Sequence, residues 1–599
     1  MKLTVLARLN PHSPGPAGGS AVLIEGDWPE GTGATDRWSL DTHIDSRFEW
    51  IDEAASYWTE VIAHEPCAGD APPAVQAAWL NALALRYYLV KLIRVVAFFS
   101  EVRRLNFGDE VEFNATRGRD EDYADIIGQL CRLAGSRLGI CWNGQATAPA
   151  PVSPTNHAWR RALARAAEWI DPRVSDVSAP RIVFCGNPRL LEPVCQETTH
   201  RGGRAWWLCD RLAMRSWLRW RRAGCGQLVC NSSLGVCDRL PRPEVGPIDC
   251  RDVDLSAAVA GWLAARMAAL GRQQTRIVVQ VERHFLRIRP DALVLDEDQT
   301  PFHRAAVAAA RHHGMQSFVV QHGAPCCRFG FAPLEADEFL AWGQSTRNQL
   351  ARWAVPTERI TTVGSLRAGG VNRSQRKRKA DQGPARILLL TTVPPRDERP
   401  DAATLHFNRT TYREMVDMAA AAVSRLPAAE MLVKLHPRAA GDPVVESAIA
   451  RHPRLQVRWV RTGSLDACLA GADCVLSCLS SAGIEATLAG LPVIQLAPVG
   501  AGRVLPHEEW GLLGTAHTEA ELDRLLAQAF SDDWRPAAVP NPNVFFCENA
   551  GVTSTAARIA EIVLRAAHDA RQTRTLEPRI GSGIRPAMRP AHGAVRAAG

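Results

Sequence analysis

Two stretches decide the fold: MLVKLHPR at residues 431–438 and VLSCLSSAGIEATLAGLPVIQLAP at residues 475–498. In each, an apolar run typical of a buried strand ends abruptly in polar residues. These polar residues are Lys434, His436 and Arg438 after the first run and Ser480 and Ser481 after the second. Because ligands of open parallel sheets bind at the carboxyl ends of the strands, we expect these side chains to line one site.

The second stretch continues as a helical pattern from about Ser480 to Ala489. The first N–H groups of a helix lack internal partners and lie at the positive end of its dipole, so they attract anions. A protonatable histidine and two hydroxyl groups beside them suit a nucleotide phosphate that leaves as charge develops on it. The expected donor site for nucleotide and phosphate comprises Lys434, His436, Pro437, Arg438, Ser480, Ser481, Gly483 and Glu485.

These residues also allow a structural interpretation. A strand-end histidine bonded to a neighbouring carbonyl would give the same sequence around His436, which Pro437 holds in an extended conformation. Glu485 would grip the diol of a ribose, or it would only complement the helix dipole. The two motifs lie one crossover apart, and this combination favours the binding site.

The composition indicates a large enzyme with two or three cores, since the chain has 599 residues, 46% hydrophobic and 22% charged. Its 70 Lys and Arg against 63 Asp and Glu give a net charge of +7, too little to predict nucleic-acid binding. We recognise neither a signal-peptide h-region nor a run of roughly 20 apolar residues that could cross a bilayer. We therefore expect a cytoplasmic protein.

Sixteen cysteines raise the question of a metal site. Cys225, Cys230 and Cys237 lack tight paired spacing, and Cys326 and Cys327 are adjacent, so the pattern predicts neither zinc nor a disulfide framework. Free cysteines in a reducing compartment are commonly small core residues. We expect inert thiols, no metal and no cofactor.

Strands and helices alternate from about residue 176, which predicts crossovers and parallel sheets. The fold class we expect is α/β: two Rossmann-like domains facing a cleft, with an additional largely helical amino-terminal region. The expected division is 1–175 for that region of unassigned role, 176–364 for an acceptor-side domain, 365–385 for a basic linker, 386–569 for a nucleotide-donor domain and 570–599 for a disordered basic tail.

The acceptor-side half contributes two polar clusters, each following an apolar strand pattern. They are Asp296, Glu297 and Asp298 after ALVL, and Gln321, His322 and Gly323 after SFVV. A carboxylate at such a strand end can take a proton from an acceptor hydroxyl, which makes Asp296 or Asp298 the candidate base. The alternative is that the acids only cap the next helix. Gly323 permits close approach of backbone to ligand, and His322 is expected to order the acceptor or the sugar.

The carboxy-terminal half resembles the donor domain of GT-B glycosyltransferases of bacterial capsule and surface-polysaccharide synthesis, which include sialyl, Kdo and polysialyl transferases, and of teichoic-acid glycerophosphotransferases. The resemblance lies in an HP motif, His436-Pro437, an SS motif, Ser480-Ser481, and the following GIEATLAGLPVI. It implies that both motifs contact donor nucleotide and phosphate. The acceptor-side sequence from 296 onward resembles capsule-synthesis proteins, but the glycine of the polysialyl base motif is absent after Asp296-Glu297-Asp298.

The resulting expectation is a metal-independent glycosyltransferase that uses a CMP- or UDP-sugar and extends a surface polysaccharide or lipid-linked glycan. The alternatives are a CDP-glycerol-type polyol-phosphate transferase, a UDP-hexosamine 2-epimerase and a catalytically silent scaffold of a polysaccharide-export complex. Residues 205–224 interleave Trp206, Trp207, Trp217 and Trp220 with arginines, which would suit peripheral contact with the inner face of the membrane. The favoured interpretation is that Trp206 and Trp207 belong to a strand and that an ordinary amphipathic helix, with its tryptophans packed inward, accounts for the rest of the segment.

Overall fold

The computed structural model describes the chain in segments. These are residues 2–8, 20–25, 36–40, 48–62, 79, 82–102, 110–116, 121–142, 178–209, 220, 224–230, 247–325, 328, 330–366, 383–392, 409–436, 441–460, 464–498, 513–531 and 554–576. Within these segments, no helix is both long and apolar enough to span a membrane.

The amino-terminal domain is built on a five-stranded parallel sheet in the order β3-β2-β1-β4-β5. Its strands are β1 (Lys2–Arg8), β2 (Ser20–Glu25), β3 (Asp36–Ser39), β4 (Glu110–Ala115) and β5 (Arg137–Trp142). Its helices are α2 (Phe48–Ile62), α4 (Ala82–Val102) and α5 (Glu121–Ala134). The description of this region as largely helical is therefore corrected: the helices are present, but they cover a parallel sheet.

The central domain is built on a seven-stranded parallel sheet in the order β14-β13-β12-β11-β6-β7-β8. Its strands are β6 (Arg181–Cys185), β7 (Arg204–Cys209), β8 (Gly226–Val229), β11 (Ala292–Leu295), β12 (Gln316–Val320), β13 (Glu338–Ala341) and β14 (Ile360–Thr362). Its helices are α7 (Pro188–His200), α10 (Pro301–His312), α11 (Gln344–Arg352) and the short 3-10 helix η4 (Thr357–Arg359). All of β11 is buried, as expected for a parallel strand covered on both faces.

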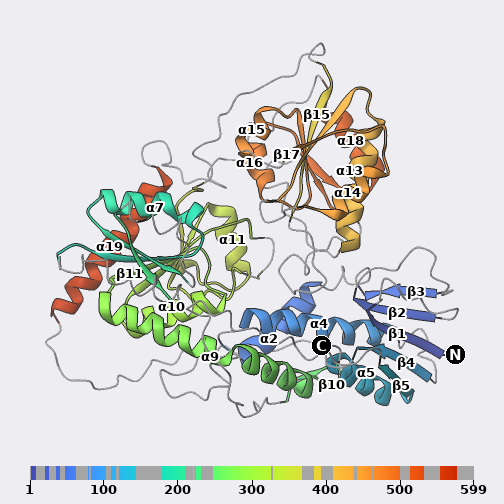
Figure 1. The fold of residues 1–599 in the computed structure, drawn as a ribbon, viewed down its shortest axis with the longest axis horizontal. Coiled ribbons are helices and arrows are strands. Elements are labelled where there is room, and N and C mark those ends of the chain that lie inside the picture. The colour runs from blue at the N-terminus through green and yellow to red at the C-terminus, as the bar shows by residue number, and fades with distance from the viewer. Residues whose placement is uncertain are drawn as a thin grey trace, which may run out of the picture.

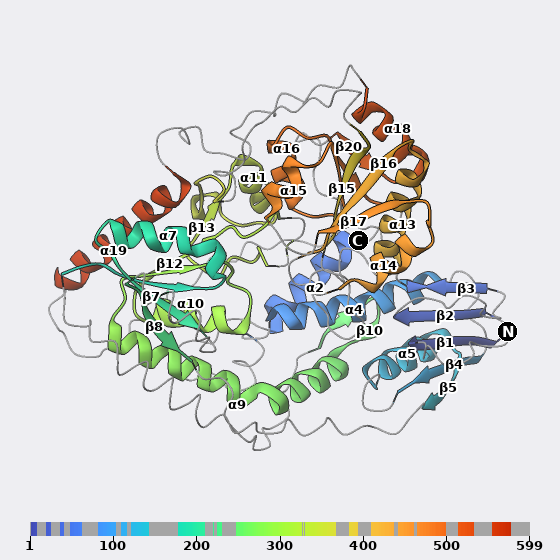
Figure 2. The same ribbon diagram turned by 45° about the horizontal axis from the view of Figure 1, so that its top comes forward.

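A 33-residue helix, α9 (Ser256–Ile288), joins the first two domains (Figures 1 and 2). Its first turns enter the amino-terminal core through Ala258 and Leu263, next to the short antiparallel pair β9 (Asp249–Cys250) and β10 (Val253–Asp254). Its last turns enter the central core through Val281 and Phe285. The first domain thus recruits residues beyond 176, where the sequence had placed its end.

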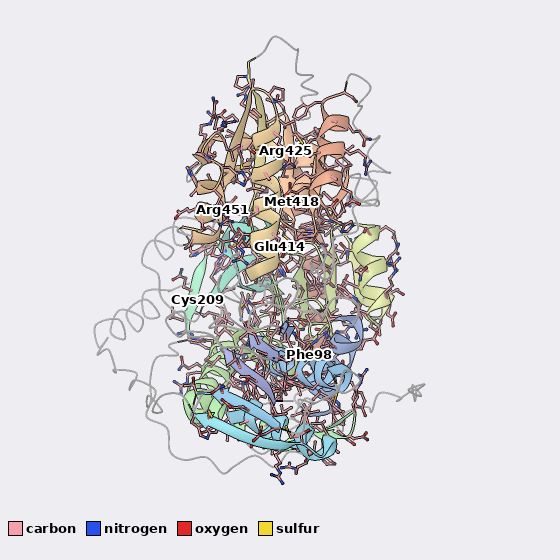
Figure 3. The ribbon with its side chains drawn as sticks, turned by 90° about the vertical axis from the view of Figure 1, so that its right-hand side faces the viewer. Phe98, Cys209, Glu414, Met418, Arg425 and Arg451 are labelled. Carbon is pink, nitrogen blue, oxygen red and sulfur yellow. The ribbon has the colours of Figure 1, made fainter. Side chains whose placement is uncertain are left out.

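The carboxy-terminal domain has a six-stranded parallel sheet in the order β17-β16-β15-β18-β19-β20. Its strands are β15 (Ala385–Leu390), β16 (Ala429–Lys434), β17 (Gln456–Val460), β18 (Cys474–Ser477), β19 (Val493–Leu496) and β20 (Gly514–Ala516). Its helices are α13 (Arg409–Arg425), α14 (Pro443–Ala450), α15 (Leu465–Ala470), α16 (Ala482–Leu488) and α18 (Glu519–Ala529). Surface ion pairs connect these helices: Arg425 of α13 contacts Glu519 of α18 at 2.9 Å, and Arg451 after α14 contacts Asp417 of α13 (Figure 3).

The last described helix, α19 (Thr555–Leu576), returns to the central domain and lies beside α7 (Figure 1). Ile559 and Val563 of α19 are fully buried against the same core as Phe184 of β6 and Leu191 of α7. The sequence had assigned this segment to the donor domain as far as 569 and had placed a disordered tail from 570. Instead, its apolar face packs on the central sheet and the helix continues through residue 576.

All three sheets have the strand order 3-2-1-4-5 or its extension when each is numbered from its own first strand. This is the Rossmann order, in which the chain reverses direction across the sheet between the first and fourth strands. The reversal lies between β6 and β11 in the central domain and between β15 and β18 in the carboxy-terminal domain. The predicted α/β fold class with two Rossmann-like domains is confirmed, and the first domain adds a third sheet of the same order.

Three of the four tryptophans considered for a membrane surface lie in the central core. Trp206 and Trp207 are 5% and 3% exposed in β7, and Trp220 is 2% exposed and stacks on Trp207 with ring centroids 4.0 Å apart. Trp217 lies outside the described residues. The tryptophans that can be located therefore contribute to packing, as the favoured interpretation of this segment proposed.

Candidate functional site

The carboxy-terminal domain gathers polar groups where its strand order reverses. Leu390 at the end of β15 pairs with Ser477 at the end of β18, and Thr391 follows directly. The Thr391 hydroxyl donates to the carbonyl of Lys434 at 3.2 Å and accepts from the backbone N–H of His436 at 3.0 Å. The sequence analysis did not identify Thr391 and Ser477 as site residues. Their signal was a hydroxyl residue directly after, or at the end of, a buried apolar run.

Ser480 is held by a tight turn after β18. Its N–H donates to the Ser477 hydroxyl at 3.1 Å, and that hydroxyl donates to the Ser480 carbonyl at 3.2 Å. Leu479 in the turn has φ of 53°. Ser481 precedes α16 but makes no side-chain capping bond to it. The turn thus brings both serines to the strand end at which Thr391 and His436 lie.

Some of the expected donor-site features need correction, and two of the expected residues lie outside the described part of the chain. Helix α16 has only seven residues, fewer than the stretch from 480 to 489 that was expected, so its dipole is a weak argument for an anion. A Cβ added to Gly483 would lie 3.3 Å from the Ser477 hydroxyl, so this glycine lets α16 pack closely on β18. Pro437 and Arg438 lie outside the described residues, and Glu485 is partly buried on α16.

A hydrogen-bonded pair in the carboxy-terminal domain, Tyr412 and Asp442, has a structural role. The Tyr412 hydroxyl of α13 donates to Asp442 at 2.6 Å, and Asp442 also caps α14 by accepting from the N–H groups of Val444 and Val445. Burial raises the pKa of the Asp442 carboxyl, against the hydrogen bonds that it accepts. Asp442 therefore acts as a structural acceptor.

The central domain has a second polar cluster at its own reversal point. Leu295 of β11 pairs with Cys185 of β6, and Asp296 and Gly186 follow the two strands. The Asp296 carboxylate accepts from the backbone N–H of Asn187 at 2.8 Å. A Cβ at Gly186, whose φ is 136°, would lie 1.9 Å from Asp296 Oδ1. Only glycine therefore allows the carboxylate to lie directly against the end of β6.

His303 of α10 lies between two carboxylates and was also missed in the sequence. Its Nε2 is 3.3 Å from Asp296 Oδ1, and its Nδ1 is 3.3 Å from Glu297 Oε1 and 2.5 Å from the Thr300 hydroxyl. The contact with Asp296 is an ion pair without hydrogen-bond alignment.

The electrostatics of this cluster favour a charged imidazole. Burial acts to lower the pKa of His303, but its acidic neighbours outweigh burial and raise the pKa well above the usual value. The neighbours that raise the pKa of His303 are Cys185 first and then Asp296 and Glu297, while burial raises the pKa of the Cys185 thiol itself. Burial would also raise the pKa of Asp296, yet His303 and the Asn187 N–H hold it lower. The raised pKa of His303 therefore favours the charged imidazolium beside the Asp296 carboxylate.

His322 is tied to the same loop. Its Nδ1 is 2.8 Å from the main-chain carbonyl of Asp296, and its ring stacks on Phe331 with centroids 5.0 Å apart and planes 12° apart. A carbonyl can only accept, so Nδ1 must carry the proton. In the neutral ring Nε2 then bears a lone pair and can accept a proton.

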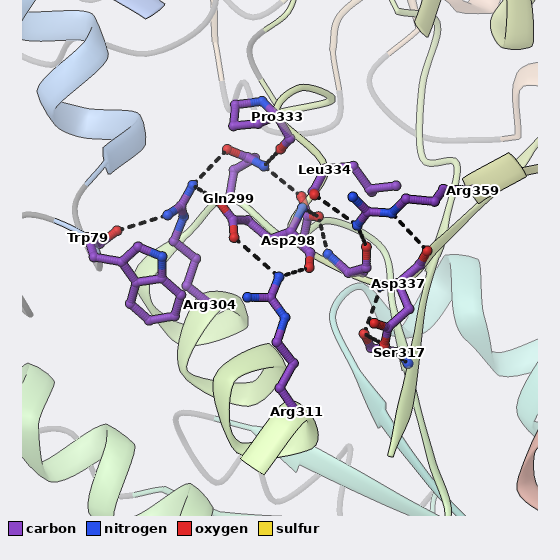
Figure 4. Close-up of polar contacts among 12 residues, drawn as sticks. Trp79, Asp298, Gln299, Arg304, Arg311, Ser317, Pro333, Leu334, Asp337 and Arg359 are labelled. Atoms are coloured by element: carbon purple, nitrogen blue, oxygen red, sulfur yellow. Dashed lines mark hydrogen bonds and ion pairs between the residues drawn. The ribbon is translucent and has the colours of Figure 1, made fainter. Parts of the chain in front are cut away.

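The other acceptor-side candidates have structural roles, and Figure 4 shows the network around Asp298. Asp298 is 1% exposed and accepts from the N–H groups of Glu335 and Ala336, at 2.6 and 2.9 Å, and from the Gln299 amide at 2.8 Å. Burial raises its pKa. Because the Asp298 carboxylate is buried and accepts these three hydrogen bonds inside the core, we no longer consider it a candidate base.

Gln321 is likewise fully buried. It accepts from the N–H of Trp342 at 2.6 Å and donates to the carbonyl of Gly323 at 2.8 Å, so it shapes the turn after β12. Gly323 has open space where a Cβ would lie. The structure therefore brings Asp296, Glu297 and His322 together and leaves Asp298 and Gln321 in the framework.

A pocket lies elsewhere, between the amino-terminal helices and the central domain. Its polar lining includes Glu60 and Arg86 from the first domain and Arg304 and Glu335 from the second. Arg304 pairs with Glu335 at 2.7 Å, and Arg86 donates to the carbonyl of Ala332 at 2.8 Å. Of these two contacts, that of Arg86 crosses the domain junction, and the strand-end residues are absent from the lining of the pocket. Among the described residues no group of three or more His, Cys, Asp or Glu could hold a metal.

The chain is thus a GT-B-like α/β protein: two Rossmann-like domains, with a final helix that returns from the second to the first. No family model and no curated protein matches the sequence. UDP-GlcNAc 2-epimerase from Neisseria meningitidis is similar at 10% identity and a TM-score of 0.40, over 65% of this chain and 100% of that one. The lipopolysaccharide outer-core galactosyltransferase WaaB is similar at 11% identity and a TM-score of 0.39, over 66% of this chain and 99% of that one. The wall teichoic acid polymerase TagF is similar at 11% identity and a TM-score of 0.35, over 70% of this chain and 97% of that one. At these identities the likeness concerns the fold alone.

Proposed function

We propose that this protein is a glycosyltransferase that moves a sugar from a CMP- or UDP-activated donor to a surface polysaccharide or lipid-linked glycan. The observation that carries the proposal is the polar cluster of Thr391, His436, Ser477 and Ser480 at the reversal point of the carboxy-terminal sheet. Open α/β sheets bind ligands at this place. His436 of the HP motif and Ser480 of the SS motif, which resemble those of capsule-type transferases, belong to this cluster.

In the proposed reaction the bond between the sugar and the nucleotide phosphate breaks, and an acceptor oxygen bonds to the sugar carbon. Ser480 and Ser481 bind the phosphate, and His436 stabilises the charge that develops on the departing nucleotide. The acceptor proton passes to a base in the central domain, in the cleft that the sequence predicts between the two domains.

His322 is better suited than Asp296 to take that proton, which exchanges the roles first expected. The Asp296 side chain is 14% exposed, is engaged by His303 and Asn187, and has a lowered pKa, which weakens it as a base. His322 is half-buried, and its protonated Nδ1 leaves Nε2 as the acceptor.

A thermal-shift panel of CMP, CDP, UDP and GDP tests the donor site, because a ligand that binds only the folded state stabilises it. We expect a cytidine or uridine nucleotide to raise Tm. We expect His436→Ala to reduce that rise and His452→Ala, in the same domain, to retain it. Failure of all four nucleotides to bind would overturn the proposal and favour the silent scaffold.

Product analysis then separates the reactions. Conversion of a UDP-sugar without acceptor would indicate an epimerase, and transfer of glycerophosphate from CDP-glycerol would indicate the polyol-phosphate reaction. Acceptor-dependent release of CMP or UDP together with sugar incorporation is the result expected for a glycosyltransferase.

A further inference from the structure

The cluster of His303, Asp296 and Glu297 has no role in the proton transfer as described. His303 is 9% exposed, and its imidazole is enclosed by two carboxylates and the Thr300 hydroxyl. His303 is buried and its two acidic partners are partly buried, with side chains 14% and 24% exposed, so these charged groups lose hydration on folding. A buried charged network of this kind next to a candidate base calls for a functional explanation.

The contacts form a continuous chain toward His322. Glu297 Oε1 is 3.3 Å from His303 Nδ1, and His303 Nε2 is 3.3 Å from Asp296 Oδ1. Asn187 N–H fixes the other carboxylate oxygen of Asp296 at 2.8 Å. The main chain of Asp296 then presents its carbonyl to His322 Nδ1 at 2.8 Å. Held by its side chain at two points, Asp296 has little freedom to turn its carbonyl away.

The charges around Asp296 explain why the contact between His303 and Asp296 needs a positively charged imidazole. The ionisable groups recorded around His303 are Asp296 and Glu297 from the loop after β11 and Cys185 from β6, and Asp296 also faces His322. Without a positive charge at position 303, the Asp296 and Glu297 carboxylates would repel each other in a poorly solvated site. The loop that carries the Asp296 carbonyl would then shift.

We propose that His303 is a positioning residue, which holds the Asp296 loop and thereby fixes the proton of His322 on Nδ1 and the lone pair on Nε2. The catalytic consequence rests on the proposed function, because it concerns the base of that reaction. The positional claim is independent of turnover. Neither Asp296 nor His303 needs to contact the substrate.

The tautomer of His322 can be measured directly by long-range ¹H–¹⁵N correlation spectra of deuterated, ¹⁵N-histidine-labelled protein, with His322→Gln used for assignment. We expect the Nδ1–H pattern in the wild type. In His303→Gln we expect His322 to shift toward the Nε2–H form that free histidine favours in water. His312→Gln is the matched control, since His312 is exposed on the same helix, and it should leave the His322 signals unchanged.

Because His303→Gln alters a buried charge, a second variant protects the test against misfolding. The Glu297 side chain is 24% exposed, so Glu297→Gln should fold, and it removes one of the two carboxylates that hold His303. We expect a smaller shift of His322 in the same direction. A folded Glu297→Gln or His303→Gln in which His322 keeps its wild-type spectrum would overturn the proposal.

Kinetics supply the second readout. If the protein is a transferase, His303→Gln should lower kcat by about tenfold to a hundredfold, as loss of a group that orients a metal-binding histidine does. KM for the nucleotide donor should change little, because the donor cluster lies in the other domain. A rise in KM without loss of kcat would contradict the positioning role. If no nucleotide sugar is turned over, the proposed function fails, while the spectra still decide the role of His303.

Discussion

The hydroxyl of Thr391 accepts a hydrogen bond from the backbone N–H of His436 at 3.0 Å and donates one to the carbonyl of Lys434 at 3.2 Å. Strands β15 and β16 are neighbours, so one side chain connects the end of the first to the residues that follow the second. The backbone that carries the His436 imidazole is therefore set by a residue 45 positions earlier in the chain.

Thr391→Val keeps the shape of the side chain and removes both hydrogen bonds. We expect a loss of about 1–3 kcal/mol in the free energy of unfolding, because the His436 N–H is left without this acceptor. We also expect about tenfold weaker nucleotide binding, measured by titration calorimetry. Thr391→Ser restores the hydroxyl and should behave as wild type. Equal affinities of the Val and Ser variants would show that the hydroxyl does not position His436.

His436→Ala should lower turnover far more than stability, since the ring follows the strand and is only partly buried. We expect a loss of about a hundredfold or more in kcat, the scale of removing one group that stabilises developing charge. The change in unfolding free energy should stay within about 1 kcal/mol. His452→Ala is the control in the same domain. If His436→Ala loses stability but still binds the nucleotide with wild-type affinity, the role of His436 is structural.

The two later sheets were predictable because their strands contain continuous apolar runs bounded by polar residues, as in ALVL before Asp296 and CVL before Ser477. The first sheet was not. Its strand β2 follows a stretch rich in Gly and Pro, and β5 begins only three residues after α5 ends. Gly135, with φ of 71°, stops that helix, but a single glycine inside a periodic pattern is a weak signal.

The sequence predicts that the candidate site residues lie at the strand ends, but it does not predict the role of each residue. Asp296 and Asp298 lie two residues apart after one strand, and only the fold shows that the first reaches the reversal point while the second enters the core. His303 was missed although Asp296, Glu297 and Thr300 lie only three to seven residues before it, because a helical pattern does not show which side chain contacts the preceding loop.

Gly186→Ala should be among the most damaging single substitutions in the central domain. The new Cβ would lie 1.9 Å from Asp296 Oδ1, so the carboxylate must move and its contacts with His303 and Asn187 must break. We expect a loss above about 3 kcal/mol in urea unfolding. Gly314→Ala is matched, since Gly314 has φ of 62° and open space at Cβ, and it should cost about 1–2 kcal/mol of backbone strain. Equal losses would refute the steric argument.

Asp298→Asn tests the assignment of that residue to the framework. The amide would present N–H groups where the carboxylate now accepts from the backbone of Glu335 and Ala336. We expect a loss of about 1–3 kcal/mol in stability and an unchanged kcat per folded molecule. Active-site titration alongside urea unfolding separates the two quantities. A folded variant without turnover would return Asp298 to the list of candidate bases.

The pH dependence of stability should reveal the His303 imidazolium. The folded pKa of His303 is raised above its unfolded value of 6.5, so its stabilisation is fully present below pH 6.5 and is lost as the pH rises through the folded pKa. The pKa of Asp296 is lowered from 3.8, so its stabilisation is present above that pH and is lost in stronger acid. We therefore expect the Tm difference between wild type and His303→Gln to be widest at about pH 5–6 and to shrink as the pH rises beyond 6.5. Scanning calorimetry from pH 4 to 9 measures it, with His312→Gln expected to follow the wild type throughout. A difference that stays constant across this range would mean that position 303 contributes packing alone, without a titrating charge.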